Sequence, residues 1–281
     1  MKRFLRLFPQ AMAEWQRDKA PRLSAALAFY TLFSLSPVLI LLVFIAGLFF
    51  GIEPTQAFLV GKIREFMGMQ AAEIIPQVFA SARPLSGILA TLAGFVVLLW
   101  GASSVFSYLR DSFCTIWGHA PHGGRFGIKG FVRHRLIGFL MVAISGALLM
   151  ATLLSTTVVA AATTFLRDLL PVPAFFFQAA DFTVSIGAVT LIFCTMYMVL
   201  APVKQRWTDV LPGSFVMAAL FTMGKALIGY YFVKTTVASA YGAAGSVVVF
   251  VIWVYFGAQI FYYGAEFNKV FTKSFGSAKN K

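Results

Sequence analysis

The sequence predicts an all-α, polytopic membrane protein with six transmembrane helices. Hydrophobic residues make up 59% of the 281 residues, and charged residues only 12%, whereas soluble domains carry about 25% charged residues. The stretch 243–265 contains no charged residue and exceeds the roughly 20 residues that a helix needs to cross a bilayer. Helices are expected because lipid offers no partner for unpaired backbone groups, and the alternating segments of a membrane β-barrel are absent.

The N-terminal segment 1–22 predicts an amphipathic helix on the membrane surface. Apolar residues recur at helical spacing between six lysines and arginines, a pattern typical of a helix on an anionic leaflet. Pro9 is expected to break or bend this helix. The apolar positions are Leu5, Phe8, Met12 and Trp15.

The first span is expected over 23–50. Small and hydroxyl-bearing residues line one face of its first half, and Pro37 removes one backbone hydrogen bond. Two interpretations stay open: a kinked helix that packs through small residues, or a polar lining of a cavity at membrane depth. The polar positions that matter are Ser24, Thr31 and Ser34.

The remaining spans follow from apolar runs of sufficient length. Between the first and second spans, residues 52–84 mix apolar and charged residues and predict one or two amphipathic helices outside the hydrocarbon. Asp209 is expected to cap the fifth span. The expected later spans are 85–106, 136–158, 182–200, 210–232 and 243–265, and a basic tail, 268–281, follows them.

Helical periodicity continues beyond the second span. An apolar face is maintained although the overall polarity rises, and Arg110 and Asp111 mark the exit from the membrane. The apolar positions are Val105, Leu109, Phe113 and Ile116.

The sixth span carries two distinct faces. Gly257 and Gly264 are seven residues apart and share a face on which another backbone can approach closely. Gln259 and Glu266 have the same spacing and form a polar stripe on roughly the opposite face. Glu266 is either an interfacial carboxylate in a packed helix or part of a substrate path.

Lys225 is a cation inside the expected fifth span. A lysine at the centre of a membrane helix costs about 2.5–3.5 kcal/mol on insertion scales. Its side chain either snorkels to the nearer surface or serves an interior function.

The distribution of lysine and arginine predicts the topology. Seventeen of the 23 fall in segments 1–22, 107–135, 201–209 and 268–281, which six spans place on one side. The positive-inside rule therefore predicts that both termini are cytoplasmic.

No catalytic or cofactor signature accompanies this architecture. The three histidines, His119, His122 and His134, share one loop region without an acidic cluster, so no metal site is expected. Nucleotide-binding and metalloprotease motifs are absent, and we expect no cofactor and no enzymatic activity. The basic N-terminus is attributed to membrane lipids rather than to nucleic acid. Cys114 and Cys194 are not expected to form a disulfide.

Four stretches resemble the YihY/BrkB family of bacterial inner-membrane proteins, formerly labelled the ribonuclease BN family. They are SAALAFYTLFSLSP (24–37), GASSVFSYLRDSFCTIWG (101–118), RWTDVLPGS (206–214) and YGAAGSVVVFVIWVYFGAQIFYYGAEF (241–267). The resemblance implies a six-span protein of the bacterial inner membrane. Family labels include tRNA processing, virulence or serum resistance, and movement of lipid or lipopolysaccharide precursors.

From the residues and this resemblance we hypothesise a protein that moves an anionic, lipid-like amphipathic substrate across the inner membrane, with anionic lipid head groups as partners. A structural envelope protein that binds a protein partner or a second copy is the alternative, and a membrane ribonuclease is a further, disfavoured one because no nuclease site is evident. The substrate-path candidates are Ser24, Thr31, Ser34, Pro37, Arg110, Lys225, Gln259 and Glu266.

Overall fold

A computed structural model describes residues 2–67, 69–73, 76, 88–119, 174–203, 205–234 and 241–275. Every regular element in these ranges is a helix, which confirms the all-α class. The helices are α1 (Lys2–Leu5), α2 (Leu7–Arg17), α3 (Ala20–Phe50), α4 (Ile52–Met67), α5 (Met69–Ala72), α7 (Ile88–Ile116), α9 (Ala174–Leu200), α10 (Trp207–Lys234) and α12 (Gly245–Phe275), with the 3-10 turn η2 (Gly242–Ala244) before the last.

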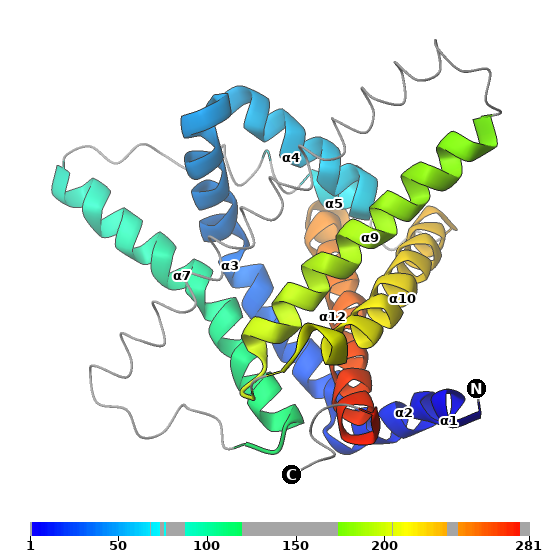
Figure 1. Cartoon of the computed structure of the whole chain (residues 1–281). Coiled ribbons are helices and arrows are strands. Elements are labelled where there is room, and N and C mark those ends of the chain that lie inside the picture. The colour runs from blue at the N-terminus through cyan, green and yellow to red at the C-terminus, as the bar shows by residue number, and fades with distance from the viewer. Residues whose placement is uncertain are drawn as a thin grey trace.

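Helix α12 lies at the centre of the molecule and contacts α2, α3, α5, α7 and α10. The long helices converge toward the end where α2 lies across the bundle, and they diverge toward the other end (Figure 1). The converging end also holds the C-terminal end of α7, the turn between α9 and α10, and the last turns of α12 (Figure 1). We call it the basic end, because most of the described lysines and arginines belong to its segments.

The largest apolar core occupies the converging part of the bundle. It is built around stacked and tilted aromatic rings: Phe113 of α7 lies 5.8 Å from Tyr197 of α9 and 5.7 Å from Phe261 of α12, measured between ring centroids. All three side chains are 6% exposed or less. Packing of these rings joins α7, α9 and α12 at this end of the bundle.

The polar continuation of the second span is helical, as its periodicity predicted. Helix α7 runs without interruption to Ile116, and the apolar face that the sequence indicated is buried: Leu109 is 5% exposed, Phe113 0% and Ile116 1%.

Two sharp turns of the chain set the directions of α2, α3 and α4. Helix α3 ends at Phe50, as predicted, and α4 begins at Ile52, so Gly51 alone makes the turn with a φ of 88°. Glycine suits this position because it has no Cβ to clash in the left-handed region. Between α2 and α3, Lys19 adopts a φ of 55°, which turns the chain from α2 into the bundle.

The described part of the segment between the first two spans is helical, as predicted. It forms α4 and α5, and Ile63 of α4 packs beside Val249 and Phe250 of α12. The amphipathic face of α4 therefore covers the diverging end of α3 and α12.

Several predicted boundaries were wrong. Asp209 does not cap α10 but lies inside its first turn, because the helix begins at Trp207. Helix α9 begins at Ala174, so residues 174–181, expected in a loop, are helical. The break near Pro9 falls at Arg6, between α1 and α2, and Pro9 sits in the first turn of α2, where its missing N–H costs little.

Helix α12 extends to Phe275, so the first residues of the expected tail continue the last helix. The third expected span, 136–158, lies outside the described residues. Within them, Trp207–Tyr231 of α10 and Gly245–Phe275 of α12 are long and apolar enough to cross a membrane, and Ser185–Leu200 of α9 is a shorter apolar helix.

Candidate functional site: an ion cluster between the first and last helices

Helix α2 docks on the basic end through one apolar face. Leu7 is 2% exposed and Ala11 is fully buried, and both belong to a cluster with Val216 of α10 and with Phe267 and Val270 of α12. Beside this cluster, the Tyr263 hydroxyl donates a hydrogen bond of 3.2 Å to the Phe8 carbonyl.

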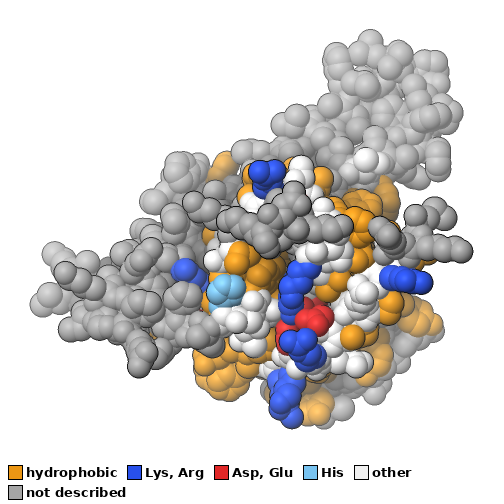
Figure 2. Space-filling view, turned by 60° about the horizontal axis from the view of Figure 1, so that its bottom comes forward, with side chains coloured by type: hydrophobic (Ala, Val, Ile, Leu, Met, Phe, Trp, Pro, Cys, Tyr) orange, Lys and Arg blue, Asp and Glu red, His pale blue; other side chains and the backbone are white. Residues whose placement is uncertain are grey.

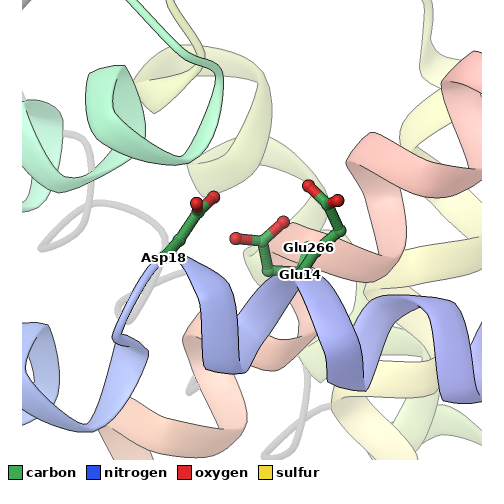
Figure 3. A group of neighbouring side chains, drawn as sticks. All are labelled: Glu14, Asp18 and Glu266. Atoms are coloured by element: carbon green, nitrogen blue, oxygen red, sulfur yellow. The ribbon is translucent and has the colours of Figure 1, made fainter.

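Next to the apolar contact, one lysine joins three carboxylates. Lys269 Nζ lies 2.7 Å from Glu14 Oε2, 3.0 Å from Asp18 Oδ2 and 3.0 Å from Glu266 Oε2. Glu14 and Asp18 point from α2 toward Glu266 on α12 (Figure 3). We call these four residues the ion cluster.

The ion cluster is largely shielded from water. The Lys269 side chain is 7% exposed, that of Asp18 14% and that of Glu266 0%. Such a cluster persists because each buried charge has an opposite charge within hydrogen-bonding distance. At its rim, exposed Arg17 also pairs with Glu14 at 3.0 Å.

The electrostatic effect is clearest at Glu14, which lies on α2 outside the expected spans. The hydrogen bond from Lys269 holds the pKa of the Glu14 carboxyl below its usual value, and the charges of Lys269 and Arg17 act in the same direction. Glu14 therefore remains ionised near neutral pH.

The carboxylates are also spaced so that they could ligate a cation, since their ligand oxygens lie within 4.8 Å of one another. The Lys269 ammonium already lies among them at 2.7–3.0 Å. A metal ion would therefore have to displace the lysine. The arrangement favours ion pairs that join α2 to α12.

The structure places the predicted hydroxyls of the first span against their own helix. Ser24 Oγ donates to the Ala20 carbonyl at 2.8 Å, Thr31 Oγ1 to that of Leu27 at 2.7 Å, and Ser34 Oγ to that of Tyr30 at 2.7 Å. Such bonds satisfy the hydroxyls locally and are common in membrane helices. Pro37 lies within the same continuous helix. Whether these residues line a substrate path stays a prediction.

The two faces of the sixth span contact different neighbours. A Cβ at Gly264 would overlap the Tyr197 hydroxyl and lie 2.8 Å from Met217 Cβ, so α9 and α10 approach α12 closely there. At Gly257 the nearest atom, in Trp253, is 3.7 Å away. Elsewhere along α12, the backbone carbonyl of Gln259 accepts a bond of 3.2 Å from Trp15 Nε1 of α2.

The remaining candidates lie apart from the ion cluster. Arg110 is partly buried near the C-terminal end of α7, at the basic end, and Lys225 is partly buried in α10. Of the predicted path residues, only Glu266 belongs to the ion cluster, within the described part of the chain.

Sequence reasoning missed Glu14, Asp18 and Lys269. One signal was present: the only two acidic residues of segment 1–22 are four apart, and Glu266 and Lys269 are three apart. These spacings put each pair on one helix face. They do not say that the two faces meet, because the helices are about 250 residues apart in sequence.

Comparison with known proteins gives the family. Residues 11–281 match the family described as Virulence factor BrkB. The chain belongs to the BrkB family.

Curated relatives of this BrkB-family chain are named UPF0761 membrane proteins. That of Teredinibacter turnerae is 25% identical over 247 residues, 86% of this chain and 54% of the relative. That of Azotobacter vinelandii is 28% identical over 258 residues, 89% and 59% respectively. That of Tolumonas auensis is 24% identical over 271 residues, 90% and 82%.

The chain spans less than two thirds of the length of the Teredinibacter and Azotobacter relatives. No solved structure matches it. Its family and its long apolar helices together identify an all-helical BrkB-family membrane protein.

Proposed function

We propose that this BrkB-family protein moves an anionic, lipid-like amphipathic molecule across a bacterial inner membrane, without enzymatic chemistry. Both chain ends lie in the cytoplasm in this proposal. The observation that carries it is Lys225, a partly buried cation within α10, a described helix that is long and apolar enough to cross a membrane.

Lys225 sits deep along α10. Eighteen residues separate it from Trp207 at the basic end, or about 27 Å at 1.5 Å per residue. Its neighbours Met223, Leu227 and Tyr230 are 62%, 67% and 65% exposed, as expected for side chains that face lipid. An ammonium along an apolar helix is costly in hydrocarbon, and its positive charge attracts an anionic head group.

The basic end supports two parts of the proposal: the orientation of the protein in the membrane and the negative charge of the substrate. Seen from that end, Lys and Arg side chains surround a small acidic patch (Figure 2). Described segments that the charge count assigned to one side meet at this end: α2, the end of α7, the turn after α9 and the end of α12. Arg110 and these side chains would attract an anionic head group from the cytoplasmic leaflet.

Lipid exchange in proteoliposomes tests the proposal. The purified full chain is reconstituted with fluorescent anionic lipids, and dithionite quenching reports how fast lipid changes leaflet, with and without a proton gradient. We expect exchange above that of protein-free liposomes and a several-fold loss in Lys225→Met. The control is Lys225→Arg, which keeps the positive charge at this position of α10 and should exchange lipid like the wild type.

Exchange no faster than in protein-free liposomes under both conditions would refute the transport proposal. Exchange that is normal in Lys225→Met would refute the assignment of Lys225.

A further inference from the structure

Helix α2 is fixed on the bundle in a single orientation by two separate contacts. Trp15 Nε1 donates to the carbonyl of Gln259, whereas Glu14 and Asp18 pair with Lys269. Gln259 and Lys269 are ten residues apart on α12, or about 15 Å along the helix axis. Gln259 lies within the expected span 243–265, and Lys269 lies beyond it.

The two contacts therefore define two rims of α2. The rim with Trp15 faces the membrane-spanning part of α12, and the rim with Glu14 and Asp18 faces away from it. Exposed residues can be assigned to these rims, because residues three or four apart are neighbours on a helix.

Apolar residues occupy the membrane-facing rim. Met12 is four residues after Phe8 and three before Trp15, so it continues their row, and it is 43% exposed. Leu5, the last residue of α1 just before α2, is 60% exposed. Both side chains are thus exposed in the described part of the chain.

Polar residues occupy the opposite rim. Gln10 precedes Glu14 by four residues, Arg6 precedes Gln10 by four, and Arg17 follows Glu14 by three; Arg6, Gln10 and Arg17 are all exposed. The two acidic residues of the segment are both used by Lys269. The charge that α2 and its flanks present outward is consequently basic, from Arg6, Arg17, Lys19 and Arg22.

We propose that α2 is a membrane-surface helix held at fixed rotation by the ion cluster, with Leu5 and Met12 inserted among the lipids of an anionic leaflet. The exposed Lys19 and Arg22, which follow α2 and lie outside the Gln10 rim, contact phosphate head groups, and the Gln10 rim faces water. The apolar row and the basic charges match the two parts of an anionic lipid surface. This surface serves anchoring and does not depend on lipid transport.

Site-directed fluorescence tests the rotation. Met12→Cys and Gln10→Cys are each labelled with bimane in the full chain, where the native Cys114 and Cys194 are buried. The protein is reconstituted into vesicles containing phosphatidylglycerol, and bimane is quenched either by lipid-borne nitroxides or by aqueous iodide. Both substituted positions are exposed on the same helix, so each is the control for the other.

We expect lipid nitroxides to quench position 12 several-fold more than position 10, and iodide to do the reverse. Replacing phosphatidylglycerol by phosphatidylcholine should weaken the lipid quenching at position 12. Equal access of iodide to both positions would overturn the proposal. Energy transfer between labelled copies, with position 12 shielded equally in neutral lipid, would also overturn it, because α2 would then cover a second copy of the chain.

Discussion

Lys269 is the residue that links α12 to the two carboxylates at the end of α2. It is the only cation placed among Glu14, Asp18 and Glu266 in the described residues, and its side chain is almost completely buried. Buried ion pairs add little net stability compared with apolar packing, but breaking one by removing a single partner is costly, because the remaining charges stay buried.

Lys269→Met should therefore destabilise the protein strongly. Three carboxylates would face one another without their shared cation, and breaking a buried ionic group in this way costs about 3–5 kcal/mol. Thermal unfolding of the purified protein in detergent measures the effect, and Lys273→Met, at an exposed position on the same helix, should unfold like the wild type.

The double variant Glu266→Gln, Lys269→Met should recover part of this loss, since it removes one of the three crowded carboxyl groups. Equal melting temperatures for Lys269→Met and the wild type would contradict the ion cluster.

Glu14 gives the ion cluster a defined pH dependence. Its pKa is lower in the folded protein than its ordinary value of 4.5, so its ionised form contributes stability that is complete above about pH 5. That contribution disappears as the pH falls through the lowered pKa. Glu14→Gln should cost about 1–2 kcal/mol at pH 7, between the values for exposed and for charged buried hydrogen bonds.

The difference in unfolding free energy between wild type and Glu14→Gln, measured from pH 7 down to pH 3, should shrink in the acid range. A difference that stays constant or grows as the pH falls would contradict the assigned pairing.

At the scale of helices, the closest packing of α12 against its neighbours occurs at a glycine, which has no side chain to keep them apart. Close approach of α9 and α10 occurs at Gly264 and not at Gly257, although the two residues share a helix face and a spacing of seven. The sequence identified the face but not the point of closest contact, because that point depends on Tyr197 and Met217 of two other helices.

Gly264→Ala should consequently be far more harmful than Gly257→Ala. The added methyl group at position 264 would overlap the Tyr197 hydroxyl and crowd Met217, and overpacking of this kind costs about 1–3 kcal/mol. At position 257 the nearest side-chain atom leaves room at 3.7 Å. Melting temperatures of the two variants, purified in parallel, check the prediction, and equal shifts would contradict the packing.

The presence of the described helices could be predicted from the sequence because apolar runs and helical periodicity are local properties. The end of α3 at Phe50 and the buried row Leu109, Phe113 and Ile116 were both evident in the sequence. Boundaries failed where neighbouring helices extend a segment: Asn268 to Val270 of α12 are buried against other elements, so the helix continues where composition indicated a basic tail.

At the scale of the whole molecule, the docking of α2 was the feature that sequence alone did not predict. The local signals in segment 1–22 indicated an amphipathic surface helix, but its buried face, through Leu7 and Ala11, contacts α10 and α12 instead of lipid. The ion cluster arises from the meeting of two distant segments, and a single sequence carries no signal for such a meeting.

The proposals for transport and for membrane anchoring share one central claim: the bundle crosses the membrane with its basic end in the cytoplasm. The α3–α4 turn and the α2 end lie at opposite ends of the bundle (Figure 1). Gly61 of α4, Gln10 of α2 and Lys273 of α12 are all exposed. Single cysteines at these positions would therefore report the two sides directly.

Labelling of these cysteines with a membrane-impermeant maleimide, in intact spheroplasts and after lysis, is the most direct measurement. The account predicts that Gly61→Cys reacts in intact spheroplasts, whereas Gln10→Cys and Lys273→Cys react only after lysis. Reaction of Gln10→Cys or Lys273→Cys in intact spheroplasts, or protection of Gly61→Cys until lysis, would contradict the claim.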